Sequence, residues 1–297
     1  MLDFHKPTLA DRDIIRPVLQ ASGYMGCEFT FGNLLMWTDF FHTSCTVFDN
    51  TFVSMSIGDN GFAAYCCPAG AKDLKKAIDE IIADSRQRNL QMSFYGVTES
   101  FRQALCELYP ERFEFVERRG SFDYIYIVSD LSDLAGKKYH PKRNHVTAFK
   151  KNNEWHYEEI SESNFHLCRA VNEEWKRLNL EKNPDAIANE SGAVDIALDN
   201  YFELGFTGGI LFADDAPVAF TFGEKINDNC FCTHVEKAFS DVRGSYAVIN
   251  REFAANTISG YKYVNREEDM GVEGLRKAKL SYHPEILLKK YNAFLKD

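Results

Sequence analysis

Several features that would narrow the function are missing from this 297-residue sequence. The eight cysteines form no CxxC pair, which argues against a common type of zinc site and against the disulfide framework of a small secreted scaffold. No apolar run approaches the length of a membrane span, and no apolar signal core follows Met1. The GxSxG, HExxH and P-loop motifs are also absent. We therefore expect a reduced cytoplasmic protein without a metal site or a tightly bound cofactor.

Positive charge is scarce as well. The chain has 34 Lys and Arg against 44 Asp and Glu, which gives a net charge of −10. Such a surface as a whole repels nucleic acid and anionic lipid, so either partner would need a local basic patch. Hydrophobic residues make up 45% of the chain and charged residues 26%, which is typical of a folded soluble protein. The length favours one large domain or two ordinary ones.

The order of predicted elements is similar in the two halves of the chain. Each half consists of a strand entry, helices, antiparallel strands, a helix, a strand and a helix, with apolar spacing that fits each element. Clear examples are the predicted helix Lys72–Arg88 and strand Gln91–Val97 in the first half, and the helix Ser245–Ser259 and strand Tyr261–Val264 in the second. The repeat rests on element order and not on residue identity. It predicts two similar α/β (α+β) units with mixed, mostly antiparallel sheets flanked by helices.

A basic segment, Gly136–Lys151, lies between the halves. It contains six Lys or Arg and two His with no acid, in an otherwise acidic chain. If it forms a helix, Val146 and Phe149 would anchor one face, and the basic side chains would project elsewhere as an anion-attracting surface. The side chains expected on that surface are those of Lys142, Arg143 and His145. The alternative is a solvated linker helix.

Acids and bases are also sorted along Asn265–Tyr282. Glu267, Glu268 and Asp269 follow the predicted strand, and a basic helix begins after the glycine-containing turn. Substrates often bind at strand ends, where the chain is exposed yet held by the sheet. The alternative is that the acids stabilise the first helical turn through the helix dipole while the bases decorate its exposed side.

Acyl transfer would use these residue types. It needs a base or a positioned acceptor, and positive or N–H groups where an oxyanion develops. Glu268 or Asp269 could orient or deprotonate the acceptor, while Arg276 and Lys279 could bind a donor phosphate or stabilise developing charge. Cys230, Cys232 and His234 alternate along one predicted strand, but a metal site would need a fourth ligand, so buried core cysteines are the expectation.

Three stretches together resemble one bacterial family. They are FTFGNLLMWTDFF, GKKYHPKRNHVTAFKK and YVNREEDMGVEGLRKAKLSYHPE. The resemblance is to proteins related to the C-terminal, cytosolic domain of phosphatidylglycerol lysyltransferases. It implies two tandem GNAT-like acyltransferase domains, an architecture that the peptidoglycan Fem transferases share. In such enzymes an aminoacyl group passes from a tRNA ester to a hydroxyl or an amine.

The resemblance implies an N-terminal GNAT-like domain at 1–130, a basic connecting segment at 131–152 and a C-terminal GNAT-like domain at 153–297. The donor would be aminoacyl-tRNA or acyl-CoA. A CoA pyrophosphate would meet the helix start at Arg243, Gly244 and Ser245, although a single glycine there also fits an ordinary capped helix. The lysyltransferases carry a long membrane region that this sequence lacks, which argues against a lipid acceptor. The alternative function is a non-catalytic module that binds an anionic ligand or a protein partner.

Overall fold

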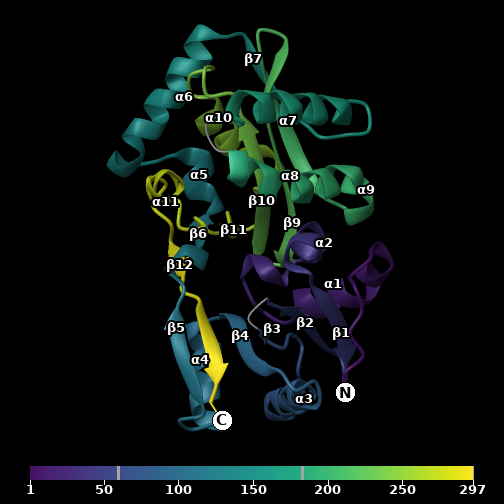
Figure 1. Cartoon of the computed structure of the whole chain (residues 1–297). Helices are drawn as coiled ribbons and strands as arrows, with labels where there is room; N and C mark the ends of the chain where they lie inside the picture. Colours follow the sequence, from purple (N-terminus) through teal and green to yellow (C-terminus); the bar gives the residue numbers. More distant parts are fainter. Residues whose placement is uncertain (59–60, 182–183, 297) are drawn as a thin grey trace. The chain divides into compact units, whose positions relative to one another are not determined.

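The computed structural model describes residues 1–58, 61–181 and 184–296 (Figure 1). They form two compact units, and neither unit is continuous in sequence. Unit 1 comprises Met1–Tyr124, Glu267–Arg276 and Leu287–Asp297, while unit 2 comprises Ile125–Arg266 and Lys277–Ile286. None of the helices in the described ranges combines the length and apolarity needed to cross a membrane.

Unit 1 contains a six-stranded sheet in the order β1-β2-β3-β4-β13-β5. The first three strands form an antiparallel meander, and β4 then pairs parallel to β3 after a helical crossover. The strands are β1 (Ser44–Phe48), β2 (Thr51–Ile57), β3 (Phe62–Cys66), β4 (Gln91–Val97), β5 (Phe113–Glu117) and β13 (Tyr291–Leu295), and the helices are α1 (Arg12–Ala21), α2 (Phe31–Phe41), α3 (Leu74–Gln87) and α4 (Glu99–Leu108).

Local sequence explains the helices of unit 1. In α3, Ile78 and Ile81 recur at helical spacing and are buried, so one face of the helix packs on the core. Asp73 caps this helix by accepting a hydrogen bond from the Lys76 N–H at 2.9 Å. Thr30 caps α2 in the same way through the Asn33 N–H. These positions confirm the helices that the apolar spacing predicts.

Unit 2 is built around a seven-stranded sheet in the order β12-β6-β11-β10-β9-β8-β7. The strands are β6 (Asp123–Ile127), β7 (Trp155–Glu159), β8 (Thr207–Ala213), β9 (Ala216–Asn227), β10 (Cys230–Ala238), β11 (Tyr263–Asn265) and β12 (Ile286–Leu288). The helices are α5 (Val128–Asp133), α6 (His140–Asn152), α7 (Phe165–Asn179), α8 (Pro184–Asp199), α9 (Tyr201–Leu204) and α10 (Ser245–Glu252), together with the second half of α11 (Glu273–Leu280), whose first turn belongs to unit 1. A π-helical turn, Phe253–Thr257, extends α10.

The two sheets share one topology. In unit 2, β8, β9 and β10 form an antiparallel meander, and β11 pairs parallel to β10 after α10, just as β4 follows β3 after α3. This duplication confirms the predicted pair of similar units and the mixed sheets expected of tandem GNAT-like domains. In each sheet the position beside the parallel strand is filled by a strand from outside the repeat, β13 in unit 1 and β6 in unit 2.

The C-terminal strands are absent from the sequence prediction. The predicted domain at 153–297 is continuous, whereas the structure places Glu267–Arg276 and Leu287–Asp297 in unit 1. The physical reason is long-range pairing, because β13 lies antiparallel between β4 and β5. A five-residue strand at the end of a chain carries no local signal that names its partner strand.

Candidate functional site

The acids Glu267, Glu268 and Asp269 follow a strand, as predicted, since β11 ends at Asn265. The backbone after it is strained. Glu267 and Met270 have φ angles of 58° and 52°, in the left-handed region that residues other than glycine rarely adopt. Such strain persists only where surrounding contacts hold it, and it clusters at functional sites. In unit 1, one such contact is the hydrogen bond from Asn33 Nδ2 to Glu267 Oε1.

Asp269 is fully buried and held by charged partners. Arg276 donates to both carboxylate oxygens, with Nε at 2.8 Å and Nη2 at 3.0 Å. Arg119 Nη1 and the Tyr124 hydroxyl donate to Oδ2, and the Gly271 N–H donates to Oδ1. Burial alone would raise the pKa of Asp269, but the bonds from Arg276, Tyr124 and Gly271 hold it well below its usual range. A carboxylate stabilised this strongly is a weak base. The geometry therefore favours an anchoring role for Asp269, and for Arg276 with it, over base catalysis and donor binding.

We expect Asp269→Asn to destabilise the fold by about 3 kcal/mol at pH 7, the low end for breaking a buried ion pair, because both arginines are a third exposed. The folded pKa of Asp269 is depressed, so its contribution is present above the unfolded pKa and is lost as the pH falls through the folded pKa. The difference in the free energy of unfolding between wild type and Asp269→Asn should therefore become smaller in acid. Urea unfolding at pH 7 and at pH 3 measures it, and equal stability of the two proteins at pH 7 would contradict the anchoring role.

Glu268 differs from its neighbour. Its side chain is half-buried, and burial raises the pKa of its carboxyl to about 7. Lys290 opposes that shift, whereas the negative charges of Asp123 and Glu28 support it. A general base works best when its pKa lies near the working pH. Of the two carboxylates that the sequence proposes as bases, Glu268 has the properties the role needs.

The group next to Glu268 in unit 1 is a buried ammonium, Lys290, whose side chain is 4% exposed. Its Nζ donates to Glu28 Oε2 at 2.6 Å and to Asp123 Oδ1 at 2.9 Å, and lies 3.7 Å from Cys27 Sγ. Asp123 is oriented from its other side by the Cys27 N–H at 2.9 Å. Because Lys290 is buried among acids, its pKa stays well above the usual range despite the burial. We call Cys27, Glu28, Asp123, Glu268 and Lys290 the acidic cluster.

The acidic cluster has a spacing that a divalent cation could bridge. Ligand atoms of Cys27, Asp123 and Glu268 lie within 4.8 Å of one another. Lys290 already brings a positive charge to Asp123 and lies beside the Cys27 sulfur. In addition, burial raises the pKa of the Cys27 thiol well above its usual range, which disfavours the thiolate that metals bind. The arrangement therefore favours an ammonium-centred cluster over a metal centre.

Unit 2 contains a second feature of interest, an opening in its sheet. β11 pairs with β10 over three residues, from Cys230 to Cys232, while β10 continues to Ala238. The register between β10 and β9 shifts between Thr233 and Val235, so the intervening residue, His234, lies in a β-bulge. Bulges bend a strand and re-aim a side chain, often near active sites. The bulge interrupts the simple alternation predicted for this strand.

The His234 side chain is fully buried and bonds Glu224 Oε1 at 3.1 Å through Nε2. Beyond the bulge, Glu236 accepts a hydrogen bond from Arg266 Nη2 at 2.7 Å. Cys230 and Cys232 are fully buried, as expected of core cysteines. The polar groups of this part of β10 are thus paired within an apolar core.

The basic segment forms a helix as predicted, α6, with Val146 and Phe149 buried. Its basic residues have different surroundings. Arg143 Nη1 donates to the carbonyl oxygens of Leu134 and Gly136, so Arg143 stabilises the turn that precedes α6. His145 is exposed. Lys142 packs over the Tyr282 ring, with Nζ 3.7 Å from the ring centroid.

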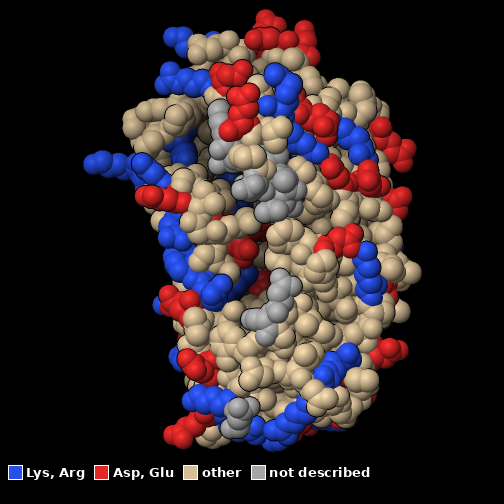
Figure 2. Space-filling view, in the orientation of Figure 1, with Lys and Arg blue, Asp and Glu red and all other residues tan. Residues whose placement is uncertain are grey.

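Lys279, the last of the expected phosphate contacts, donates through Nζ to the carbonyl oxygen of Arg266 at 2.5 Å. The carbonyl oxygen of Lys279 in turn accepts from the Tyr126 hydroxyl at 2.8 Å. Lys279 therefore helps to hold the end of β11. Lys and Arg side chains do gather on the edge that carries α11, on the face shown in Figure 2.

The expected CoA contact is a tight helix start. Gly244 has a φ of 94°, and a Cβ there would lie 2.6 Å from the carbonyl oxygen of His145, so only glycine fits without a shift. Ser245 is buried, with its hydroxyl donating to the carbonyl oxygen of Phe239 and its N–H to that of Val242. Arg243 is exposed. Ser245 thus has a structural role, and a phosphate contact there stays a hypothesis.

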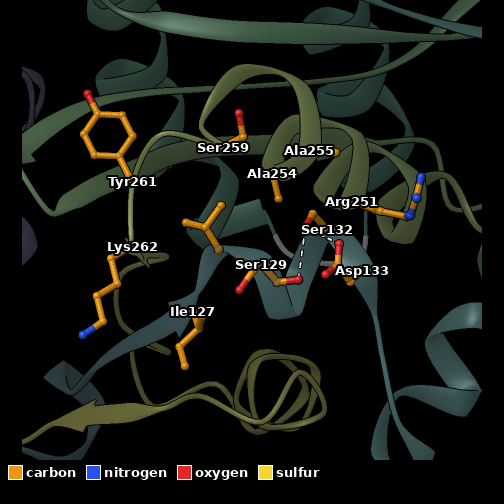
Figure 3. Close-up of a pocket in the computed structure, with 11 residues that line it drawn as sticks. Ile127, Ser129, Ser132, Asp133, Arg251, Ala254, Ala255, Ser259, Tyr261 and Lys262 are labelled. Atoms are coloured by element: carbon orange, nitrogen blue, oxygen red, sulfur yellow. Dashed lines mark hydrogen bonds between the residues drawn. The ribbon is translucent and has the colours of Figure 1, made fainter.

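A cavity of about 300 Å³ in unit 2 lies elsewhere (Figure 3). It is lined by α5, the π-helical turn after α10 and the loop before β11, and none of the site residues proposed from the sequence is among its described lining residues. Among the lining residues, Ser132 donates to the carbonyl oxygen of Ser129, while the Lys262 side chain points away from these serines. The cavity and the acidic cluster are therefore separate features.

Sequence reasoning missed most of the acidic cluster. Lys290 has no motif around it, and β13, the strand that follows it, was not foreseen. Asp123 did leave a signal, because it is an acid in the aromatic, apolar run Ser121–Val128. A charged residue in such a strand is costly unless it is paired, which points to a buried partner.

Comparisons with known proteins agree with this architecture. The family model described as phosphatidylglycerol lysyltransferase, C-terminal, matches residues 20–294. A conserved protein of unknown function from Bacteroides thetaiotaomicron is 41% identical, with a TM-score of 0.94 and 100% of each chain covered. An uncharacterised protein of Mycoplasmoides gallisepticum is 25% identical over 177 residues, which are 58% of this chain and 55% of that protein. The match thus spans about half the length of that curated relative.

Two solved structures carry descriptions that name an activity. The C-terminal domain of a putative lysylphosphatidylglycerol synthetase from Agrobacterium fabrum has a TM-score of 0.71 at 13% identity, covering 98% of this chain and 93% of that chain. L-PGS from Bacillus licheniformis has a TM-score of 0.69 at 13% identity, with 97% and 92% covered. At this identity the likeness establishes the fold. Because the family model covers nearly all of the sequence, the chain belongs to the family of phosphatidylglycerol lysyltransferase C-terminal domains.

Proposed function

We propose that this chain transfers an aminoacyl or acyl group, from aminoacyl-tRNA or acyl-CoA, to a hydroxyl or amine acceptor. The observation that carries the proposal is the half-buried Glu268 carboxyl, with a pKa of about 7, on a strained segment beside a buried ammonium. The family has a transferase-type fold, and this carboxyl supplies the one group that acyl transfer needs from the protein to activate an acceptor.

In the proposed reaction, ionised Glu268 takes the proton of the acceptor hydroxyl or amine as that atom attacks the donor carbonyl. The carbon–oxygen or carbon–sulfur bond to the donor then breaks, and the leaving oxygen or sulfur receives the proton that Glu268 took up, which returns Glu268 to its ionised form. Lys290 and Asp123 keep Glu268 poised between its two protonation states, because one lowers and the other raises its pKa. Asp269 fixes the turn that presents Glu268, through Arg119 and Arg276.

Donor phosphates would be attracted by the basic edge at α11 and by exposed residues of α6 and the α10 entry. Among the contacts expected from the sequence, His145 and Arg243 are exposed and suited to this role. Arg143, Arg276 and Lys279 are bonded to the protein itself. We therefore propose His145 and Arg243 as the residues to test first for donor affinity.

A thermal-shift panel with acetyl-CoA, longer acyl-CoAs and aminoacyl-tRNA tests the proposal. A donor at a hundred times its dissociation constant stabilises the folded state by about 2.7 kcal/mol. For a chain of this size that raises Tm by about 5 °C. The donor found this way should then transfer its acyl group to an added hydroxyl or amine acceptor. Phosphatidylglycerol vesicles are one of the acceptors to test. Stabilisation without transfer to any acceptor would instead favour a binding module.

A further inference from the structure

Lys142 has surroundings unlike those of its neighbours on the same basic segment. Within the described part of the chain it makes no ion pair and no hydrogen bond, and its Nζ lies 3.7 Å from the centre of the Tyr282 ring. Lys138 instead pairs with Asp130 at 3.1 Å, and Lys150 pairs with Glu252 at 2.8 Å. Lys137 and Lys151 make no described ion pair either, but both are exposed, so Lys142 is the half-buried amine of this segment that no carboxylate in the described residues holds as an ammonium.

The groups that face Lys142 come from three other elements of unit 2. Arg266, which follows β11, lies against the same Tyr282 ring, with Cζ 5.0 Å from its centroid. Glu236 on β10 supplies the nearest negative charge, but its two oxygens accept from Arg266 Nη2 and Asn250 Nδ2. Burial and the Arg266 charge lower the pKa of Lys142 to about 8, against the opposing effect of Glu236. Tyr282 stays neutral because burial raises its pKa.

Arg266 also offers an unused donor. Its Nη1 is buried and, among the described residues, has no acceptor, while Nη2 is bonded to Glu236. A buried guanidinium N–H without an acceptor is destabilising, so a carbonyl oxygen that reaches it is stabilised. Arg266 is the first residue after β11, where the pairing between β10 and β11 has ended.

A poorly solvated amine and a guanidinium with an unused N–H donor thus lie against the same ring. An amine in this position is a nucleophile, and a preorganised N–H donor stabilises the oxyanion that forms when an amine attacks a carbonyl. We propose that Lys142 is a self-acylation site that takes an acyl group from a thioester or an activated ester.

The reaction balances without further reactants. The neutral Nζ of Lys142 attacks the carbonyl carbon, and the carbonyl oxygen accepts the N–H of Arg266 Nη1 as its negative charge develops. The carbon–sulfur or carbon–oxygen bond then breaks. The leaving thiolate or alkoxide takes up the proton that the nitrogen loses, and an amide remains on Lys142. This step uses neither Glu268 nor an external acceptor, so it stands independently of the proposed transfer function.

The test is acetylation of the full chain by acetyl-CoA and by p-nitrophenyl acetate, from pH 6.5 to 9.5, followed by peptide mass spectrometry. Lys138 is the internal comparator, since Asp130 raises its pKa. At pH 7.5 the neutral fraction of an amine with a pKa near 8 exceeds that of an ordinary lysine on the order of a hundredfold. Even with lower intrinsic nucleophilicity, we expect Lys142 to react at least tenfold faster than Lys138 with one reagent or both, and its rate to level off above about pH 8.

Two variants sharpen the test. Lys142→Arg should remove the fast phase without lowering Tm, while Glu268→Gln should leave it unchanged, which separates self-acylation from the proposed transfer. If Lys142 reacts no faster than Lys138 with either reagent, or if its rate keeps rising to pH 9.5, the proposal is wrong.

Discussion

Glu268→Gln is expected to lower transfer activity at least a hundredfold while leaving the fold intact. A positioned general base contributes about 10²–10⁴-fold to a rate, and glutamine keeps the shape of the side chain but cannot take up the proton. The variant should be at least as stable as wild type at pH 8. Burial disfavours the charged form of Glu268, as its raised pKa indicates. The neutral amide of glutamine avoids the cost of removing a charge from water.

The pH profile gives an independent readout of the same residue. The base form of Glu268 is populated above its pKa of about 7, so kcat/KM of wild type should rise through pH 7 and level off above it. Glu268→Gln should retain a low rate without this rise. Steady-state rates with the donor identified by thermal shift, measured from pH 5.5 to 9, provide the test.

Glu273→Gln is the matched control. Glu273 lies in the first turn of α11 and is exposed, so its loss should change only a helix-dipole interaction of about 0.3–1 kcal/mol. It should keep full activity. Full activity of Glu268→Gln as well would exclude Glu268 as the base, and the acceptor would then be activated by position.

The fold was largely predictable because its signals are local. The apolar spacing of α3 and its Asp73 cap mark that helix, and the β-branched and aromatic residues of β2 mark a strand. The repeated order of such elements was enough to predict two similar units. Pairing between distant strands was not predictable, since β13 is short and its partners β4 and β5 lie far away in sequence.

The candidate site was predictable only in part, for a related reason. Glu268 and Asp269 have the same residue type and neighbouring positions, so the sequence could not assign them different roles. Their pKa values diverge because Asp269 turns toward two arginines, whereas Glu268 is desolvated beside other acids. Lys142 shows the same limit. A basic run predicts an anion-binding surface, and only the structure shows that burial and the nearby Arg266 charge lower the pKa of this one lysine.

Lys290→Met is expected to destabilise unit 1 by about 3–5 kcal/mol, because it leaves Glu28 and Asp123 as buried carboxylates without their counter-charge. For a chain of this size Tm should fall by about 6–9 °C. Glu28 Oε1 has no partner among the described residues, and Glu28 Oε2 accepts from Lys290. Loss of Lys290 therefore removes the ion pair of the Glu28 carboxylate. The deficit should shrink in acid, where a protonated carboxyl needs no counter-charge.

Lys289→Met is the matched control, since Lys289 is exposed, and it should leave Tm nearly unchanged. The double variant Lys290→Met with Asp123→Asn should recover part of the loss, because removing both charges of a buried pair costs less than removing one. Thermal and urea unfolding of wild type, Lys290→Met, Asp123→Asn and the double variant form a double-mutant cycle. Additive losses would mean that Lys290 and Asp123 do not stabilise each other. A coupling of 1 kcal/mol or more would establish that the buried ammonium of Lys290 and the Asp123 carboxylate stabilise each other within the acidic cluster.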